Sequence, residues 1–555
     1  MEIISIKNLN FKYPNSKNKA VDNVNLSFNQ GEFIVVCGES GSGKTTLMKL
    51  MKREIAPFGE KSGEITYKGQ PLNDLDKRTC SEKIGFVFQK PEQQIVTDKV
   101  WHELAFGLES LGYSTDYIRL RVGEMSSYFG ISHLFHKKTT SLSGGEKQLM
   151  NLASVMAMSP DVLILDEPTS QLDPIAANDF ITTLYKLNRE LGITVIISEH
   201  RLQELFPIGD KVMVLEQGRV IAFDSPREVC GKLINHKISL SFPSAVQIWN
   251  RYNGSNKRKT KCPLTVKEGR DLINSNFSER KLGLKKKENK TEEIAVELED
   301  VFFRYTRSGD DVLKGTTLRV QNGEHFCILG GNGSGKTTTL KIIAGIISPY
   351  RGKVFINGKN MKKKSSDDFS SLGVALLPQN PDTLFLTDSI RDDYLEMCKI
   401  KGYSSESAAE IIEKIADELG IAHLMNKHPY DLSGGEIQRC AVGKILLANP
   451  KIILLDEPTK GMDSCSKNTL AKILDRINSK GVTIVTVTHD VEFAAVVAHR
   501  CGLFFDGEIL SSSIPQKFFS MNNFYTTSTV RICRDKFKNA VTVDDAVELM
   551  EGSNE

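Results

Sequence analysis

Short apolar runs separated by polar, helix-compatible stretches form the basic pattern of the chain. The run at 32–37 ends in cysteine. Gly38, the rest of a glycine-rich loop and an expected helix at 45–51 follow it. Buried strands are expected at four further β-branched or apolar runs, 162–165, 194–197, 452–455 and 483–487. Strands that alternate with helical stretches predict an α/β fold with a mostly parallel sheet and helices on both of its faces.

The apolar runs are all short. None exceeds six residues even when glycine is counted, and 342–347 is one of that length. A membrane-spanning helix needs about 20 such residues, so we expect that the chain does not cross a bilayer by itself. Residues 1–14 alternate in polarity instead of forming the apolar core of a signal peptide.

Several sequence motifs occur twice along the chain, in the same order. GESGSGKTT at 38–46 recurs as GGNGSGKTT at 330–338, SLSGGEKQ at 141–148 as DLSGGEIQ at 431–438, and LILDEPT at 163–169 as ILLDEPT at 453–459. The offset drifts only from 292 residues, between Tyr13 and Tyr305, to 289 residues, between His200 and His489. The 555 residues therefore hold two copies of one domain, each of about 230 residues, instead of the three or four domains that length suggests.

The segment between the two copies differs from the rest of the chain in its charge. The chain has 72 Lys and Arg against 69 Asp and Glu, which argues against a nucleic-acid-binding protein that is basic over its whole length. Residues 251–290, however, contain thirteen basic and four acidic residues. We expect a solvated linker there, with contact to anionic lipid headgroups as the alternative. The predicted organisation is a first domain at 1–234, a basic linker at 235–292, a second domain at 293–520 and a tail at 521–555. The ten cysteines form no C-x-x-C pair, so no zinc or iron–sulfur site is evident.

Both glycine-rich loops match G-x-x-x-x-G-K-[ST], the pattern of a phosphate-binding loop. Glycines let backbone N–H groups turn inward around phosphate oxygens, and the following helix points its positive end at the same charge. Lys44 and Lys336 are expected to reach the β- and γ-phosphates, and Thr45 and Thr337 to offer hydroxyls to Mg²⁺. The predicted nucleotide-binding residues are Gly38, Ser40, Gly41, Ser42, Gly43, Lys44, Thr45 and Thr46 in one copy, and Gly330, Asn332, Gly333, Ser334, Gly335, Lys336, Thr337 and Thr338 in the other.

Further polar residues recur at matched spacing and predict the rest of a catalytic site. An aspartate that ends a buried strand is expected to bind Mg²⁺, and the glutamate after it could polarise an attacking water. A glutamine in matching phrases could ligate Mg²⁺ or position water, and a histidine follows a β-branched strand in each copy. The metal candidates are Thr45, Gln89, Asp166, Thr337, Gln379 and Asp456; the catalytic candidates are Gln89, Glu167, His200, Gln379, Glu457 and His489.

Tyr13 and Tyr305 each lie 31 residues before the lysine of the phosphate loop. An aromatic ring there could stack on adenine. The alternative is a tyrosine that only packs within its strand.

The phosphate loop, glutamine phrase, LSGGE, LLDEPT and terminal histidine, in this order, resemble the nucleotide-binding domain of the ABC ATPase family. LSGGE is the discriminating motif, since many other phosphate-loop proteins share the phosphate loop and the acidic strand. The resemblance covers about 460 of the 555 residues. It implies two tandem ABC ATPase domains that bind ATP and Mg²⁺, each with a mostly parallel sheet, flanking helices, an antiparallel β part and a helical signature subdomain.

The family resemblance also implies that the two halves pair head to tail. Each ATP would then lie between the phosphate loop of one half and the signature of the other. The signature residues Ser143, Gly144 and Gly145 would close on ATP held by Lys336, and Ser433, Gly434 and Gly435 on ATP held by Lys44. We expect both sites to hydrolyse ATP, because neither half has lost its Lys, Asp, Glu or His. Differences such as Leu149 against Arg439 leave their equivalence open.

Finer phrases resemble the ATPases of energy-coupling factor (ECF) transporters, which take up vitamins and metals. These phrases are FVFQKPEQQIVTDKVWHELAFGLESLG and LLPQNPDTLFLTDSIRDD. The resemblance implies a peripheral protein on the cytoplasmic face of the cell membrane. Its partners would be a transmembrane coupling subunit and a substrate-binding membrane subunit, with no nucleic acid. The coupling subunit would dock beside Gln89 and Gln379, where residues 100–111 form part of a groove or, alternatively, only face their own core. A tandem sugar-importer ATPase and a ribosome-associated ABC translation factor are the alternative functions.

Overall fold

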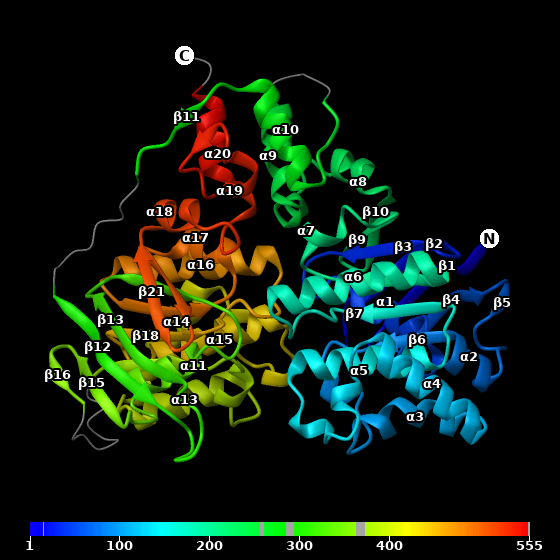
Figure 1. Cartoon of the computed structure of the whole chain (residues 1–555), viewed down its shortest axis with the longest axis horizontal. Helices are drawn as coiled ribbons and strands as arrows, with labels where there is room; N and C mark the ends of the chain where they lie inside the picture. Colours follow the sequence, from blue (N-terminus) through cyan, green and yellow to red (C-terminus); the bar gives the residue numbers. More distant parts are fainter. Residues whose placement is uncertain (15, 256–259, 285–292, 362–371, 553–555) are drawn as a thin grey trace. The chain divides into compact units, whose positions relative to one another are not determined.

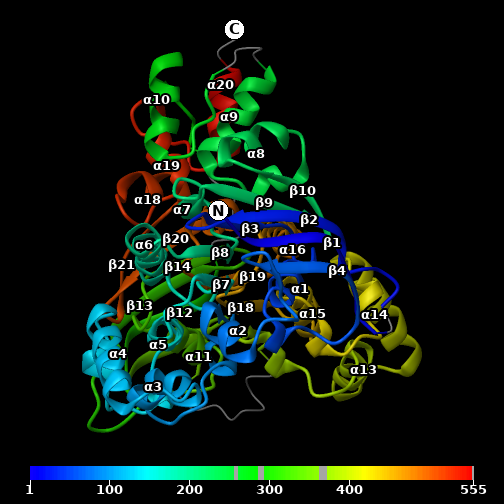
Figure 2. The same ribbon diagram turned by 90° about the vertical axis from the view of Figure 1, so that its right-hand side faces the viewer.

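The computed structural model describes residues 1–14, 16–255, 260–284, 293–361 and 372–552. These residues divide into two compact units, 1–246 and 247–555. Figure 1 labels their helices and strands, and Figure 2 shows them from the side. Helix α9 (Ser244–Ser255) runs across the division.

The central sheet of the first unit has six strands in the order β10-β9-β3-β8-β7-β6. Strand β3 pairs in parallel with β8 and β9, and β7 pairs in parallel with β6 and β8; only the edge strand β10 is antiparallel to its neighbour. The strands are β3 (Phe33–Cys37), β6 (Ile84–Val87), β7 (Val162–Asp166), β8 (Thr194–Ser198), β9 (Lys211–Glu216) and β10 (Arg219–Asp224). Every residue of β3, β7 and β8 is buried, because helices cover both faces of this sheet.

A second, antiparallel sheet of the first unit has the order β2-β1-β4-β5. Its strands are β1 (Glu2–Lys12), β2 (Val21–Asn29), β4 (Glu60–Tyr67) and β5 (Gln70–Pro71). The apolar side chains of β1 and β2 share one buried cluster with Ile34 and Val36 of β3. The two sheets therefore enclose a common core.

Helices of the first unit fall into two groups. Those that flank the sheets are α1 (Lys44–Leu50), α2 (Lys77–Lys83), α6 (Pro174–Leu191), α7 (Leu202–Leu205) and α8 (Pro226–Lys232). The other group, α3 (Val100–Ser110), α4 (Thr115–Tyr128) and α5 (Gly144–Ala157), packs together as a helical part, seen in cyan in Figure 1. This part carries the signature sequence.

The second unit repeats this plan. Its six-stranded sheet has the order β17-β18-β19-β14-β20-β21, and its four-stranded antiparallel sheet the order β13-β12-β15-β16. The strands are β12 (Ile294–Phe303), β13 (Leu313–Gln321), β14 (His325–Leu329), β15 (Arg351–Ile356), β16 (Lys359–Asn360), β17 (Val374–Leu377), β18 (Ile452–Asp456), β19 (Thr483–Thr488), β20 (Arg500–Phe505) and β21 (Glu508–Ser513). The helices are α11 (Lys336–Ile343), α13 (Ile390–Ile400), α14 (Ser405–Leu419), α15 (Gly434–Leu446), α16 (Ser464–Ser479), α17 (Val491–Val497) and α18 (Pro515–Met521).

The α/β fold predicted for the two copies is confirmed, and each expected strand forms to within one residue of its predicted bounds. In the central sheets the parallel strands end at one edge, where the phosphate loops follow β3 and β14 and the aspartates end β7 and β18. Within the described ranges, we find no helix that is both long and apolar enough to span a bilayer.

The region between the copies has more structure than a solvated linker would have. It contains the end of α9, α10 (Val266–Asn276) and β11 (Arg280–Lys281). These elements pack against α19 (Ser528–Cys533), β22 (Phe537–Lys538) and α20 (Val543–Glu551) of the C-terminal segment. In Figures 1 and 2, α10, α19 and α20 lie together.

Specific contacts join these two distant segments. Strand β11 pairs in parallel with β22, and the Arg270 guanidinium donates two hydrogen bonds to the carbonyl of Arg531, at 3.1 and 2.8 Å. Ile273 is fully buried in this small assembly. The basic runs 257–259 and 285–287, on which the prediction of a solvated linker rested, lie outside the described residues. The described part of 247–284 is folded because its apolar side chains are covered by residues more than 200 positions away.

Candidate active site

The first phosphate loop connects β3 to α1 and depends on glycine for its path. Gly43 has φ of 101°, and a Cβ atom on it would lie 2.2 Å from the carbonyl oxygen of Ala20. The equivalent Gly335 has φ of 111°, and its Cβ would lie 2.9 Å from the carbonyl oxygen of Val312. Both positions therefore exclude any side chain.

The loop lysines are buried, and their ammonium groups lie inside the loops. The Nζ atom of Lys44 donates hydrogen bonds to the carbonyls of Gly38 and Glu39, at 2.9 and 3.0 Å. Lys336 donates to the carbonyls of Gly330 and Gly331, at 3.0 and 2.7 Å. Each lysine is thus held where a phosphate oxygen bound by the loop would meet it.

Each loop also has a buried hydroxyl without a hydrogen-bond partner among the described residues. These are the Oγ atoms of Ser42 and Ser334. A buried hydroxyl normally has a partner. A phosphate group in the loop would satisfy both, so the cradle fits a nucleotide.

An aspartate faces the threonine of each loop. The hydroxyl of Thr337 donates to Oδ1 of Asp456 at 3.0 Å, and Thr45 is hydrogen-bonded to Asp166. Burial is the main cause that raises the pKa of both carboxyls, and for Asp456 the pKa reaches about 6. A carboxylate beside a hydroxyl is the hard oxygen donor set that Mg²⁺ prefers, and a cation would favour the ionised carboxylates. These residues fit magnesium.

In the first half, Glu167 is contacted by two other predicted residues. The side-chain amide of Gln89 donates to its Oε2 at 2.6 Å, and Nε2 of His200 lies 2.9 Å from its Oε1. The structure thus assembles all three predicted catalytic residues of this half around one carboxylate.

The second half assembles two of its three. Nδ1 of His489 lies 2.9 Å from Oε2 of Glu457, and the histidine backbone N–H donates to the same oxygen at 3.3 Å. Gln379 is exposed and makes no hydrogen bond to Glu457. The two candidate sites are therefore not identical in this structure.

Both glutamates have a left-handed backbone, which no sequence pattern predicted. The φ angle is 44° at Glu167 and 49° at Glu457. Such a conformation costs roughly 1–3 kcal/mol and tends to occur at functional sites. The backbone N–H of Glu167 offsets part of this cost by donating to the carbonyl and to the hydroxyl of Ser198, both at 3.0 Å.

A buried glutamate, Glu199, lies beside the first site and was not among the predicted site residues. One carboxylate oxygen of Glu199 accepts from the backbone N–H and hydroxyl of Thr169, at 2.8 and 2.6 Å, and the other accepts from the N–H of His200 at 3.1 Å. Burial is the main cause that raises its pKa. The second half has Thr488 at this position, a difference that comparison of the two copies shows in the sequence.

The predicted adenine-stacking tyrosines are tied to the helices that follow the phosphate loops. The hydroxyl oxygens of Tyr13 and Thr46 are 3.0 Å apart, as are those of Tyr305 and Thr338. Each ring also makes an edge-on contact with the phenylalanine two positions earlier, which belongs to the strand that precedes the tyrosine. The rings remain 38% and 60% exposed, so one side of each is open to a planar ligand.

The signature serines begin the helices that follow them. Ser143 is the N-cap of α5 and Ser433 that of α15, and each forms a capping box with the glutamate three residues later. Gly144, Gly145, Gly434 and Gly435 form the first turns of these helices. No hydrogen bond joins either serine to the phosphate loop of its own half. Their predicted contact with ATP across the two halves remains a prediction.

Comparison with known proteins supports this reading of the two copies. The family described as ABC transporter matches residues 21–170 and 313–460. A protein of Bacillus anthracis described as an ABC transporter ATP-binding protein is 38% identical over 98% of this chain and 97% of its own length. A second, from Caldanaerobacter subterraneus, is 32% identical over 91% of this chain and 90% of its own length. The solved structure of cbiO1 from Clostridium perfringens, described as part of the ABC transporter complex cbiONQ, is 32% identical, with a TM-score of 0.38 over 43% of this chain and 97% of that one.

Proposed function

The chain belongs to the ABC transporter family as an ATP-binding subunit with two fused ATPase halves, and on this premise we propose that it hydrolyses ATP at two sites to drive uptake through a separate membrane subunit. The observation that carries the proposal is the position of Glu167. Its carboxylate lies directly after the strand that ends in Asp166, within hydrogen-bonding reach of Gln89 and His200. A carboxylate held from two sides can orient and polarise a water molecule for in-line attack.

Each half contributes the same parts. Lys44 and Lys336 would neutralise charge on the β- and γ-phosphates, and Glu167 and Glu457 would take up a proton from the attacking water. His200 and His489 would hold those carboxylates in place. Tyr13 and Tyr305 would stack on adenine with the open side of each ring.

The oxygen donors beside each phosphate loop would hold Mg²⁺: Thr45, Gln89 and Asp166 in the first half, and Thr337, Gln379 and Asp456 in the second. When bound, the ion would supply charge neutralisation at the β- and γ-phosphates.

The signatures would complete the sites across the two halves. Ser143, Gly144 and Gly145 would close on ATP held by Lys336, and Ser433, Gly434 and Gly435 on ATP held by Lys44. A helix N-terminus capped by serine presents N–H groups and a hydroxyl that suit a γ-phosphate. ATP would then join the two halves, and its hydrolysis would release them, which is the motion that a membrane partner could use.

Transport of the ECF type is the finer proposal. Its support is the wording of the two glutamine regions, FVFQKPEQQ and LLPQNPDT, and the surface of α3 that follows the first of them. Leu104 and Leu108 of α3 face the core, whereas Trp101 and Phe106 are partly exposed. Those two rings would contact a transmembrane coupling subunit, and the chain would lie peripherally on the cytoplasmic face of the cell membrane. A substrate-binding membrane subunit would select the vitamin or metal.

Two measurements test the proposal. Steady-state ATP hydrolysis by the purified chain should fall by about half in Glu167→Gln and in Glu457→Gln, and at least tenfold in the double variant, because each change removes from one site a proton acceptor that is worth about 10²–10⁴-fold. If either change left hydrolysis intact, the proposal of two hydrolytic sites would be wrong. Purification of the tagged chain from mildly solubilised membranes should recover a multi-span membrane protein. Recovery of ribosomal proteins instead would overturn the transport proposal and leave the ATPase proposal in place.

A further inference from the structure

One residue of the first phosphate loop has the wrong charge for its surroundings. Glu39 lies between Gly38 and Ser40, inside a loop whose predicted ligand is a polyanion. Its backbone carbonyl accepts a hydrogen bond from the Lys44 ammonium at 3.0 Å. The Glu39 backbone thus contacts the Lys44 ammonium, which would bind phosphate. Only the length of the Glu39 side chain separates its carboxylate from this contact. Without a counter-ion, this carboxylate would repel the phosphates or compete with them for Lys44.

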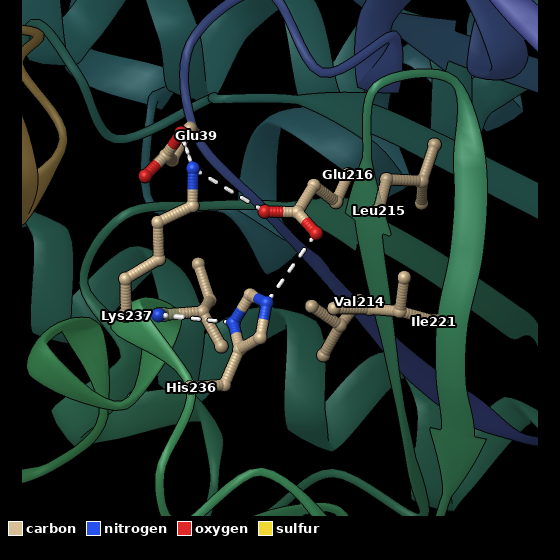
Figure 3. A pocket seen from close by; sticks show the side chains of 8 residues that line it. Glu39, Val214, Leu215, Glu216, Ile221, His236 and Lys237 are labelled. Carbon is tan, nitrogen blue, oxygen red and sulfur yellow. Dashed lines mark hydrogen bonds and ion pairs between the residues drawn. The ribbon is translucent and has the colours of Figure 1, made fainter.

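A lysine from outside the loop supplies that counter-ion. Nζ of Lys237 lies 3.0 Å from Oε2 of Glu39 and 3.3 Å from Oε1 of Glu216, at the end of β9 (Figure 3). Hydrogen bonds to both carboxylates raise the pKa of the Lys237 ammonium, so it stays charged. Lys237 thus holds the Glu39 side chain on the side of the loop that faces β9.

The position of Lys237 is set by a short turn at Lys237–Ser241 that follows α8. Nδ1 of His236 accepts from the N–H of Ile238 at 3.3 Å, and Nε2 of His236 lies 3.3 Å from Glu216. Ile238 is buried and lines the same small hollow as Val214, Leu215 and Ile221 of the adjacent hairpin. The lysine therefore extends from an anchored segment instead of from a free surface chain.

The second copy provides an internal control. The residue that corresponds to Glu39 is Gly331, which carries no charge. A Cβ built on Gly331 would lie 3.6 Å from the hydroxyl of Tyr525. Tyr525 comes ten residues after the start of α18, as Lys237 comes eleven after the start of α8. The same neighbour position thus holds lysine where the loop has glutamate, and tyrosine where the loop has glycine.

From this matched difference we propose that Lys237 is a positioning residue of the first ATP site, and that it acts by neutralising Glu39 so that the phosphate loop and Lys44 remain free to bind the polyphosphate of ATP. The inference rests on the proposed function, since it assigns a role at the site that binds ATP. It also makes the two sites unequal, because the second loop has Gly331 in place of Glu39 and so has no carboxylate there that needs a counter-ion.

The test isolates the first site by using Lys336→Ala as the parent, and measures the Kd of a fluorescent ATP analogue with Mg²⁺ at low ionic strength. Lys237→Ala should raise that Kd about three- to tenfold, because Lys237 and Glu39 are partly exposed and water screens their interaction. The effect should shrink in 0.5 M salt. Lys237→Arg should bind within about twofold of the parent.

Rescue distinguishes a charge effect from a general loss of structure. Glu39→Gln combined with Lys237→Ala should restore the parent Kd, because no carboxylate then needs a counter-ion. Lys232→Ala is the matched control and should have no effect, because it removes only an exposed ion pair between Lys232 and Asp224. An unchanged Kd in Lys237→Ala, or a double variant as weak as Lys237→Ala, would overturn the inference while leaving ATP binding established. Absence of nucleotide binding by the parent and by the reciprocal Lys44→Ala variant would overturn the proposed function and the inference with it.

Discussion

The side-chain amide of Gln89 donates a 2.6 Å hydrogen bond to the carboxylate of Glu167, whereas the corresponding Gln379 makes no such bond to Glu457. Gln89 follows β6, which pairs directly with β7, and Glu167 follows β7. The hydrogen bond therefore links the loop predicted to meet the membrane partner to the residue predicted to activate water. If a membrane partner docks at this loop as proposed, the first half has a direct connection between docking and chemistry.

This difference predicts unequal effects of the two glutamines. Gln89→Ala should lower kcat at the first site about tenfold, because it removes one of the two groups that orient Glu167. Gln379→Ala should lower kcat at the second site by less than Gln89→Ala does at the first, because Gln379 makes no hydrogen bond to Glu457. Hydrolysis is measured with the other site silenced by Glu457→Gln or Glu167→Gln, respectively. Equal losses at both sites would show that Gln379 reaches Glu457 during turnover.

Asp393, in α13, predicts a pH-dependent contribution to stability. Its carboxylate is buried; it is paired with Lys444 and accepts from the backbone N–H groups of Leu386 and Thr387, at 2.9 and 3.1 Å. Burial alone would raise the pKa of Asp393, but Lys444 and these N–H groups outweigh it and hold the pKa below the usual value of 3.8. The folded protein therefore binds this proton less readily than the unfolded chain does, and the stabilisation is lost as the pH falls below about 4.

Asp393→Asn should accordingly destabilise the protein at pH 7 by about 3 kcal/mol, since it leaves the largely buried Lys444 ammonium with only the carbonyl of Leu384 as a partner. The difference from the native chain should narrow as urea unfolding is repeated at pH values approaching 3. Asp392→Asn, at the exposed neighbouring position, is the control. A difference that is constant with pH would contradict the proposed ionisation.

The full burial of Ile273 predicts that packing against the C-terminal segment stabilises the segment between the ABC halves. Ile273→Ala removes a fully buried side chain and should cost about 2–4 kcal/mol. Lys267→Ala, on the exposed side of the same helix, should cost less than about 0.5 kcal/mol. Hydrogen exchange in α10 and α19 is the direct measurement, and both helices should lose protection together in Ile273→Ala. Loss of protection in α10 alone would show that the two segments do not fold as one.

Gly331 predicts the converse of the Lys237 experiment. Gly331→Glu places a carboxylate in the second phosphate loop, where the neighbour is Tyr525 and the space accepts a side chain. ATP binding measured in a Lys44→Ala background should weaken about three- to tenfold at low salt. Adding Tyr525→Lys should recover part of the loss, and Gly331→Gln should bind as the parent does. Weakening by Gly331→Gln as large as that by Gly331→Glu would indicate crowding instead of charge.

Sequence analysis could predict the sheets and most of the first site because these depend on local patterns. A buried strand, the glycines after it and the aspartate at the end of the next strand are each specified within a few residues, and parallel pairing then brings them to one edge. Glu167, Gln89 and His200 were predicted from phrases repeated in both copies. The same phrases predicted an equal role for Gln379, and they failed to separate the two glutamines because side-chain direction depends on the packing of the loop around it.

Other features depend on contacts that no local pattern announces. The left-handed φ of Glu167 and Glu457 is accompanied by hydrogen bonds that their backbone N–H groups donate to neighbouring strands, and Lys237 meets Glu39 across almost 200 residues of sequence. The folding of 247–284 escaped prediction for a similar reason. Its apolar residues are sparse among basic ones, and the surface that covers them is supplied by residues 522–552.

The pairing of β11 with β22 has a consequence for how the chain is made. Arg280 and Lys281 leave the ribosome 257 residues before Phe537 and Lys538, their partners in the sheet. At roughly 5–20 residues per second, synthesis of the intervening chain takes about 13–50 s. Through that interval the first ABC half already has every strand of its own sheets. Ile273 and Leu282, in contrast, still lack the later residues that bury them in the folded protein. The segment between the two ABC halves is thus covered by residues that are translated much later, and this small assembly is where a product stalled in between would expose apolar surface.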